Sequence, residues 1–281
     1  MQMKDWQIIP EIVGCNANLR LAAMDAFNAV KHGRHLVVEG EPGSGRRLLA
    51  RSAWARRSPG ARSLFTLDCR MFSSEEIWVL LFGERSSRGA HTTIQLGKLN
   101  LSAGGGLLLL NAEILSHKVQ RGLAYALRHF PERPGSEGIQ LLLTCATPSL
   151  DAQQSLHPDL ADLLTRVRVP ALRERVEDIR AIAETFIHSF SPFETIRCSQ
   201  ALIDTFCRYD WPGNVRQLRL VLRRLLMEPH GCTLDMCNLA ELMYLDETCF
   251  ALVQEIRSAA FLPIEAGVIS HNSVVAGWSV Q

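Results

Sequence analysis

The stretch LVVEGEPGSGRRLLARSAWARR, Leu36–Arg57, carries the clearest structural signal in the chain. Its first four residues, Leu36–Glu39, predict a strand, and residues 46–57 predict a helix. The segment between them, GEPGSGRR (Gly40–Arg47), has the G-x-x-x-x-G spacing of a P-loop. Such a loop aims backbone N–H groups and a helix N-terminus at phosphate, and its glycines permit the close backbone approach this needs. The strand–loop–helix order therefore predicts a phosphate-binding turn.

The loop departs from the usual P-loop at one chemical position, where Arg46 replaces the lysine. The guanidinium keeps the positive charge, but a planar group on a longer stem does not replace a compact ammonium at the β- and γ-phosphates. We therefore expect weak nucleotide binding. The alternative is a glycine turn that only joins the strand to the helix.

The rest of the chain alternates short apolar runs with amphipathic stretches, a pattern typical of a parallel α/β sheet. The predicted strands are Leu36–Glu39, Leu64–Asp68, Leu107–Leu110, Leu141–Cys145 and Val167–Val169. The predicted helices are 17–31, 46–57, 74–82 and 116–129, and then, after the strands stop at Pro170, 177–190, 199–209 and 214–227. This change predicts an α/β core over residues 1–172, a small helical lid over 173–228 and a C-terminal tail over 229–281.

Composition excludes several classes of protein. Lys and Arg total 30 against 29 Asp and Glu, so the chain has no global basic field for nucleic acid. It has no apolar run long enough for a membrane helix and no secretory signal, so we expect a cytoplasmic protein that does not bind membranes. Eight cysteines without a CxxC pair predict no metal site.

Two later strings carry a family resemblance. VPALRERVEDI (Val169–Ile179) is similar to LPPLRERREDI, and WPGNVRQL (Trp211–Leu218) is similar to WPGNVREL. Both are motifs of the AAA+ central domain of the bacterial activators of sigma-54 RNA polymerase, which the chain resembles over residues 8–228. The resemblance implies a P-loop AAA+ core with a parallel sheet flanked by helices, followed by a small all-helical lid. It also implies ATP or ADP as ligand, ring oligomers, and as partner sigma-54 RNA polymerase or an active AAA+ paralogue.

The same resemblance implies a set of nucleotide-binding residues. They come from the family's start motif, its P-loop and its lid arginine. They are Ile12, Val13, Gly40, Glu41, Pro42, Gly43, Ser44, Gly45, Arg46, Arg47 and Arg216.

The family's catalytic acids are missing. The Walker B segment GRFELADGGTLFLDEIG, laid without gaps on residues 97–113, puts its Asp and Glu on Leu110 and Asn111; a shift of one residue gives Asn111 and Ala112. The Asp of such a pair holds Mg²⁺ and the Glu orients or deprotonates water. Leu can do neither and Asn is a very poor base, which puts Mg²⁺ binding in doubt. Glu113 is nearby but is expected beyond the strand end.

Other family positions change as well. The sensor Asn becomes Pro148, and the Asn that restrains the catalytic Glu becomes Asp68. The arginine fingers correspond to His157 and Leu163, whereas the lid arginine, Arg216, is intact. We therefore predict that ATP hydrolysis is absent or very weak.

The segment that in the family contacts sigma-54 with a GAFTGA motif corresponds to RSSRGAHTTIQ, residues 85–95, whose first five residues predict a loop. Gly89, Ala90 and Thr92 resemble the motif, but His91 replaces its Phe. This predicts either an altered sigma contact or a loop with no remaining role.

The tail faintly resembles a helix-turn-helix at residues 267–278. From residue 229 onward, however, it has one Arg against six acids, a net charge of −5. Because DNA affinity rests largely on cations, specific DNA binding is not expected. A small helical or partner-binding segment is the alternative.

These observations favour a regulator of sigma-54-dependent transcription that acts by binding nucleotide and partner rather than by turnover. One alternative is an authentic ATP-hydrolysing activator with unusual catalytic residues. The other is a non-catalytic interaction protein unrelated to transcription.

Overall fold

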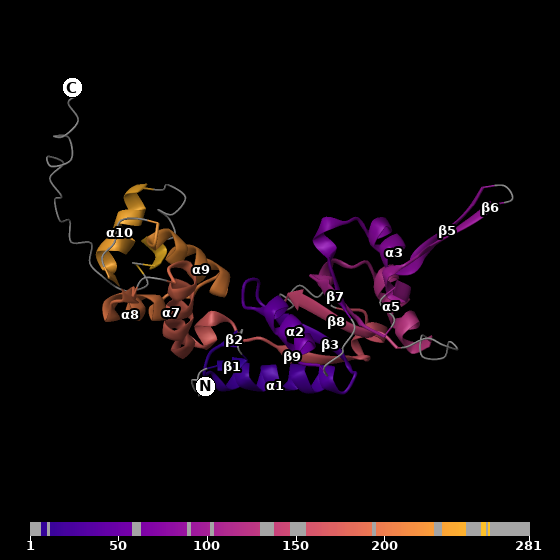
Figure 1. The fold of residues 1–281 in the computed structure, drawn as a ribbon, viewed down its shortest axis with the longest axis horizontal. Helices are drawn as coiled ribbons and strands as arrows, with labels where there is room; N and C mark the ends of the chain where they lie inside the picture. The colour runs from indigo at the N-terminus through magenta and orange to yellow at the C-terminus, as the bar shows by residue number, and fades with distance from the viewer. Residues whose placement is uncertain are drawn as a thin grey trace, which may run out of the picture.

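The computed structural model describes most of the chain in two lobes, a core and a lid, which Figure 1 shows side by side. The described residues are 7–9, 12–57, 63–88, 91–101, 104–129, 138–146, 156–192, 195–227, 232–245, 254–256 and 258. None of the helices described is both long and apolar enough to cross a membrane.

The core is built on a five-stranded sheet in which every neighbouring pair is parallel, in the order β4-β7-β8-β3-β9. Its strands are β3 (His35–Gly40), β4 (Leu64–Asp68), β7 (Gly106–Leu110), β8 (Gln140–Ala146) and β9 (Leu164–Arg168). This confirms the predicted α/β class. The last strand begins three residues before its predicted start at Val167, because its edge position admits polar residues that hide the apolar pattern.

Helices cover both faces of the sheet because side chains alternate along each strand. Leu36 and Val38 pack on one face with α1 (Ala17–Lys31) and α2 (Arg46–Ala55), whereas Val37 points to the other face. The helices on that second face are α3 (Ser74–Phe82), α4 (Lys98–Leu101) and α5 (His117–His129), followed by the short α6 (Pro158–Ala161). The strand ends are thereby held between two apolar layers.

An antiparallel hairpin leaves the core after α3. It consists of β5 (Gly83–Arg88) and β6 (His91–Leu96), and it projects away from the lid (Figure 1). The predicted loop over residues 85–89 is therefore wrong for Arg85–Arg88. The sequence of this hairpin is largely polar and lacks the apolar alternation by which strands are recognised.

The lid packs helices around its own apolar cluster, which includes Trp211 and Phe206. Its helices are α7 (Ile179–Phe190), α8 (Gln200–Arg208), α9 (Asn214–Leu225) and α10 (Met236–Leu245). A parallel pair of two-residue strands, β10 (Arg197–Cys198) and β11 (Thr233–Leu234), was not predicted. The cluster also takes in Leu234, Leu239 and Ile256, which follow residue 228.

The remaining elements are short. β1 (Gln7–Ile9) and β2 (Ile12–Val13) form an antiparallel pair before α1. Turns of 3-10 helix follow β4, β7 and β9: η1 (Cys69–Met71), η2 (Ala112–Ile114), η5 (Leu172–Glu174) and η6 (Val176–Asp178). The last two connect the sheet directly to α7 of the lid.

Candidate functional site

The P-loop leaves the carboxyl end of β3 and turns into α2 at Gly45, whose φ of 114° only glycine adopts readily. Gly43 has a φ of +82°, and a Cβ added there would lie 2.2 Å from the carbonyl oxygen of Gly213 in the lid. The loop therefore needs glycine at residue 43 because the lid backbone passes directly over it.

Arg46 begins α2 and is buried within this loop, with 8% of its surface exposed. Within the part of the chain that the structure describes, its Nη1 has no hydrogen-bond partner. Burial lowers the pKa of this guanidinium, and the nearby carboxylate of Glu113 partly opposes that shift. A buried cation at a helix N-terminus is a strong attractor for an anion.

The carboxyl end of β7 holds Leu110 and Asn111, the positions at which the resemblance leads us to expect the family's acids. Leu110 is buried in the apolar layer beneath α1 and α2. Asn111 has a φ of 57°, and its Nδ2 donates to Asp68 Oδ1 at 2.8 Å. Its backbone N–H donates to Thr144 Oγ1 at 3.1 Å. Asn111 and Asp68 are thus hydrogen-bonded to each other at the carboxyl ends of β7 and β4.

Glu113 is turned back toward the sheet rather than away from it. Its Oε2 accepts a hydrogen bond from the backbone N–H of Ala146 at 3.2 Å. Its Oε1 lies 3.8 Å from Arg70 Nη2, and only 6% of the side chain is exposed. The expectation that Glu113 lies beyond the strand end holds for its backbone, but its carboxylate returns to the end of β8.

The two strings that carried the resemblance fasten the lid to the P-loop. Glu41 forms an ion pair with Arg173 and accepts a hydrogen bond from Asn214 Nδ2 at 3.0 Å. The hydrogen bonds from Arg173 hold the pKa of Glu41 down to about 2. Arg175, which is buried, donates from Nη2 to the carbonyl oxygen of Ser44 at 2.7 Å. We call these contacts the latch.

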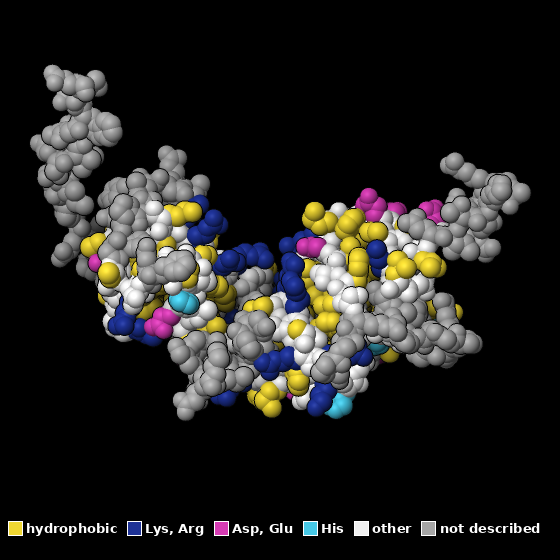
Figure 2. Space-filling view, in the orientation of Figure 1, with side chains coloured by type: hydrophobic (Ala, Val, Ile, Leu, Met, Phe, Trp, Pro, Cys, Tyr) yellow, Lys and Arg dark blue, Asp and Glu magenta, His cyan; other side chains and the backbone are white. Residues whose placement is uncertain are grey.

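A cleft of about 820 Å³ lies between the P-loop, the ends of β4, β7 and β8, and the lid helices α7 and α9. Most of its charged lining is arginine, and the apolar lining includes Leu48, Phe186 and Val215. Figure 2 shows the Lys and Arg side chains gathered on both walls of the hollow between the lobes.

The cleft brings together nine of the residues singled out in the sequence. They are Pro42, Gly43, Gly45, Arg46, Arg47, Asp68, Leu110, Asn111 and Arg216. The remaining P-loop residues, Gly40, Glu41 and Ser44, lie beneath it or in the latch. Their roles in binding stay predictions.

Other predicted residues lie away from the cleft. Ile12 packs in the core beside α1, and Val13 packs against the lid cluster. His157 caps α6 and Leu163 packs on the far side of the sheet. Pro148, Gly89 and Ala90 lie outside the described residues, while His91 and Thr92 begin β6.

Sequence reasoning missed part of the cleft lining. Arg51, Arg70 and Arg219 face the cleft from α2, from the turn after β4 and from α9. Arg51 and Arg219 carried a usable signal, because Arg51 follows Arg47 by four residues and Arg219 follows Arg216 by three, each pair on one helix face. Arg70 is brought near by the sheet order, which no local pattern indicates.

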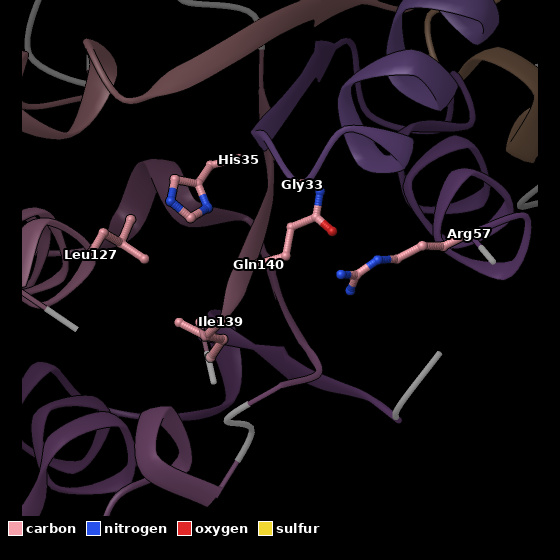
Figure 3. Close-up of a pocket in the computed structure, with 7 residues that line it drawn as sticks. Gly33, His35, Arg57, Leu127, Ile139 and Gln140 are labelled. Carbon is pink, nitrogen blue, oxygen red and sulfur yellow. The ribbon is translucent and has the colours of Figure 1, made fainter. Parts of the chain in front are cut away.

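A second pocket, of about 350 Å³, lies at the opposite, amino-terminal edge of the sheet (Figure 3). His35, Arg57 and Gln140 line it, and the Gln140 amide donates to the carbonyl oxygens of Val30 and Arg34. These bonds join β8 to the end of α1. The pocket contains none of the residues singled out in the sequence.

Comparison with known families now gives the assignment. Residues 12–138 match the sigma-54 interaction domain, and residues 173–248 match the AAA+ ATPase lid domain. The chain belongs to the AAA+ family of sigma-54-dependent activators. The match to the sigma-54 interaction domain includes the P-loop, the β5–β6 hairpin and the end of β7.

Individual relatives agree with this family. The chain is 30% identical over 237 residues to the HTH-type transcriptional regulatory protein TyrR of Enterobacter agglomerans, covering 78% of this chain and 45% of that protein. It is 28% identical over 242 residues to the regulatory protein LuxO of Vibrio vulnificus, covering 80% and 52%. The chain thus spans about half the length of the curated relatives it matches.

Solved structures agree on the fold. NtrX from Brucella abortus in complex with ATP superposes with a TM-score of 0.65 at 22% identity, over 77% of this chain and 50% of that one. A variant of RuvB from Thermotoga maritima gives a TM-score of 0.57 at 13% identity, over 82% and 69%. These likenesses support the AAA+ core and lid.

Proposed function

We propose that this sigma-54-family chain is a regulator of sigma-54-dependent transcription that binds ATP or ADP but does not hydrolyse ATP. The main support is the end of β7, where a buried Leu110 and the amide of Asn111 stand in place of the family's two acids. Leu110 can neither hold Mg²⁺ nor deprotonate water, and Asn111 carries no charge and is a very poor base. In contrast, the P-loop keeps its glycines, its helix N-terminus and a buried cation, Arg46.

The partner proposal rests on the hairpin and on ring geometry. The β5–β6 hairpin, which carries His91 and Thr92, projects from the core in the region matched to the sigma-54 interaction domain. We take it as the contact with sigma-54 RNA polymerase. Because ring contacts between AAA+ subunits are heterologous, this chain can dock an active paralogue even though its own site is inactive. A cytoplasmic location is part of the same proposal.

The proposal is tested by measuring binding and turnover on the same protein. Calorimetry with ATP and ADP should detect binding by the wild type and weaker binding by Arg216→Ala. Arg223→Ala is a matched control, because Arg223 is exposed on the same helix and does not line the cleft. Absence of binding by the wild type at millimolar nucleotide would refute the nucleotide part of the proposal.

The partner part is tested by mixing. Titrating this chain into an active family member should change the ATPase activity of the mixture nonlinearly, because a site works only when its acids and its neighbour's fingers are both intact. No effect at any ratio would contradict the proposed association.

One observation favours a second candidate, an activator that hydrolyses ATP with an exchanged acid. Asp68 places a carboxylate against the strand end from β4, 2.8 Å from the Asn111 amide. If Asp68 acted as the base, the wild type would release phosphate from Mg-ATP and Asp68→Asn would abolish the release.

A further inference from the structure

The cleft is lined by more positively charged than negatively charged side chains. Among the described residues, six arginine side chains face it from three elements, against the single carboxylate of Asp68. The arginines are Arg46, Arg47 and Arg51 from α2, Arg70 from the turn after β4, and Arg216 and Arg219 from α9. Figure 2 shows such positive side chains on both walls of the hollow. Two walls of guanidinium groups surround a volume that can hold a polyphosphate.

The innermost of these cations has no protein partner at one of its nitrogens. Arg46 is more than nine-tenths buried, and its Nη1 makes no hydrogen bond within the described residues. It sits at the N-terminus of the ten-residue helix α2, where the helix dipole also attracts negative charge. A phosphate oxygen is the kind of group that would satisfy this nitrogen.

The carboxylates near the cleft already accept hydrogen bonds from other groups of the protein. Asp68 Oδ1 accepts hydrogen bonds from Asn111 Nδ2 and from the backbone N–H of Arg70 at 3.1 Å. Glu113 is bound to the N–H of Ala146 and faces Arg70. In the described part of the chain, no group of three His, Cys, Asp or Glu side chains could hold a metal ion. Mg²⁺ in nucleotide sites relies on one or two carboxylates in addition to the phosphates. Asp68, the carboxylate that lines the described part of this cleft, already accepts two hydrogen bonds and lies among six arginines, so the cleft does not fit the metal.

We infer that the cleft binds a nucleoside di- or triphosphate as its metal-free anion, with arginines supplying the counter-charge that Mg²⁺ supplies elsewhere in the family. The inference rests on the proposed nucleotide binding and specifies the form of the ligand. Guanidinium groups bind phosphate oxygens through paired N–H donors, so they neutralise and orient the same oxygens that a metal would coordinate. The apolar lining by Leu48, Phe186 and Val215 offers a surface for the base.

The test compares binding with and without the metal. Calorimetry of ADP and ATP on the full chain is performed in EDTA and in excess MgCl₂ at equal ionic strength. We expect binding in EDTA to be at least as tight as with Mg²⁺, because Mg²⁺ removes two of the negative charges that the arginines bind. Binding that requires Mg²⁺ would overturn this inference while leaving the proposed function intact. Absence of binding in both buffers would overturn both.

Variants identify the groups responsible. Arg47→Gln and Arg51→Gln, at exposed positions on α2, should each weaken ADP binding in EDTA by about two- to fivefold. Arg56→Gln is the matched control, since Arg56 is exposed at the end of the same helix and does not line the cleft. Equal effects of all three variants would contradict a role for the cleft charges. Tripolyphosphate, tested alongside, should bind more weakly than ATP, and equal affinity would overturn the nucleoside part of the inference.

Discussion

Replacing Glu41 by Gln would remove the charge that holds the P-loop to the lid while keeping the size of the side chain. The pKa of Glu41 is lowered from 4.5 to about 2, first by the hydrogen bonds from Arg173 and then by that from Asn214. A shift of that size corresponds to about 3 kcal/mol of stabilisation by linkage. Because 42% of the Arg173 side chain is exposed to solvent, which screens the pair, we reduce this to about 1–2 kcal/mol.

The pH dependence follows from the direction of the shift. A carboxylate whose pKa is lowered on folding stabilises the protein above its unfolded pKa and loses that effect as the pH falls toward its folded pKa. The stabilisation from Glu41 should therefore be complete above about pH 4.5 and largely lost near pH 2. At pH 7 we expect Glu41→Gln to lower the melting temperature by about 2–5 °C.

The assay is thermal unfolding followed by circular dichroism at pH 7 and at pH 3. Glu184→Gln serves as control, because Glu184 is 60% exposed in an ion pair within α7 and should contribute little. A double-mutant cycle with Arg173→Gln should give a coupling of about 1 kcal/mol or more. A coupling near zero, or a difference between wild type and Glu41→Gln that is equal at both pH values, would show that the Glu41 charge does not hold the lid.

Three further results are expected. Gly43→Val should lower the free energy of unfolding by about 1–3 kcal/mol and weaken nucleotide binding, because residue 43 has a positive φ and its Cβ would collide with Gly213. Thermal unfolding and calorimetry measure the two effects, and wild-type values in both would contradict the prediction. Leu110→Asp combined with Asn111→Glu should not create ATPase activity, because the finger positions remain without arginine; phosphate release at the rate of an active relative would contradict this. The chain alone should give no sequence-dependent DNase footprint upstream of a sigma-54 promoter, because its tail has one Arg against six acids, and a protected site would prove this wrong.

Much of the fold followed from local patterns. Helix α1 matches its predicted range, residues 17–31, and in the structure Asn16 caps its start by accepting a hydrogen bond from the backbone N–H of Leu19 at 3.1 Å. Strands β7 and β8 are apolar on both faces, so their runs stand out in the sequence. Strand β9 was displaced in the prediction because it is an edge strand, in which Arg166 points outward and pairs with Glu39 at 3.2 Å.

The site was only partly predictable. The P-loop could be recognised because its glycines are closely spaced and follow a strand. The hydrogen bond between Asp68 and Asn111 depends on β4 lying beside β7, a pairing that joins residues 43 apart. The latch was present in the two quoted strings, but nothing local indicates that Arg175 reaches Ser44 or that Asn214 reaches Glu41. Such contacts follow from the placement of the lid over the core.

Nucleotide binding without hydrolysis is tested in a single experiment by following bound ATP and released phosphate in one sample of the purified chain with Mg²⁺ present. We expect ATP to bind through the cleft and to be recovered intact, with no phosphate release above that of the buffer. Turnover at a rate comparable to that of an active family member with its Walker acids would contradict the proposed function.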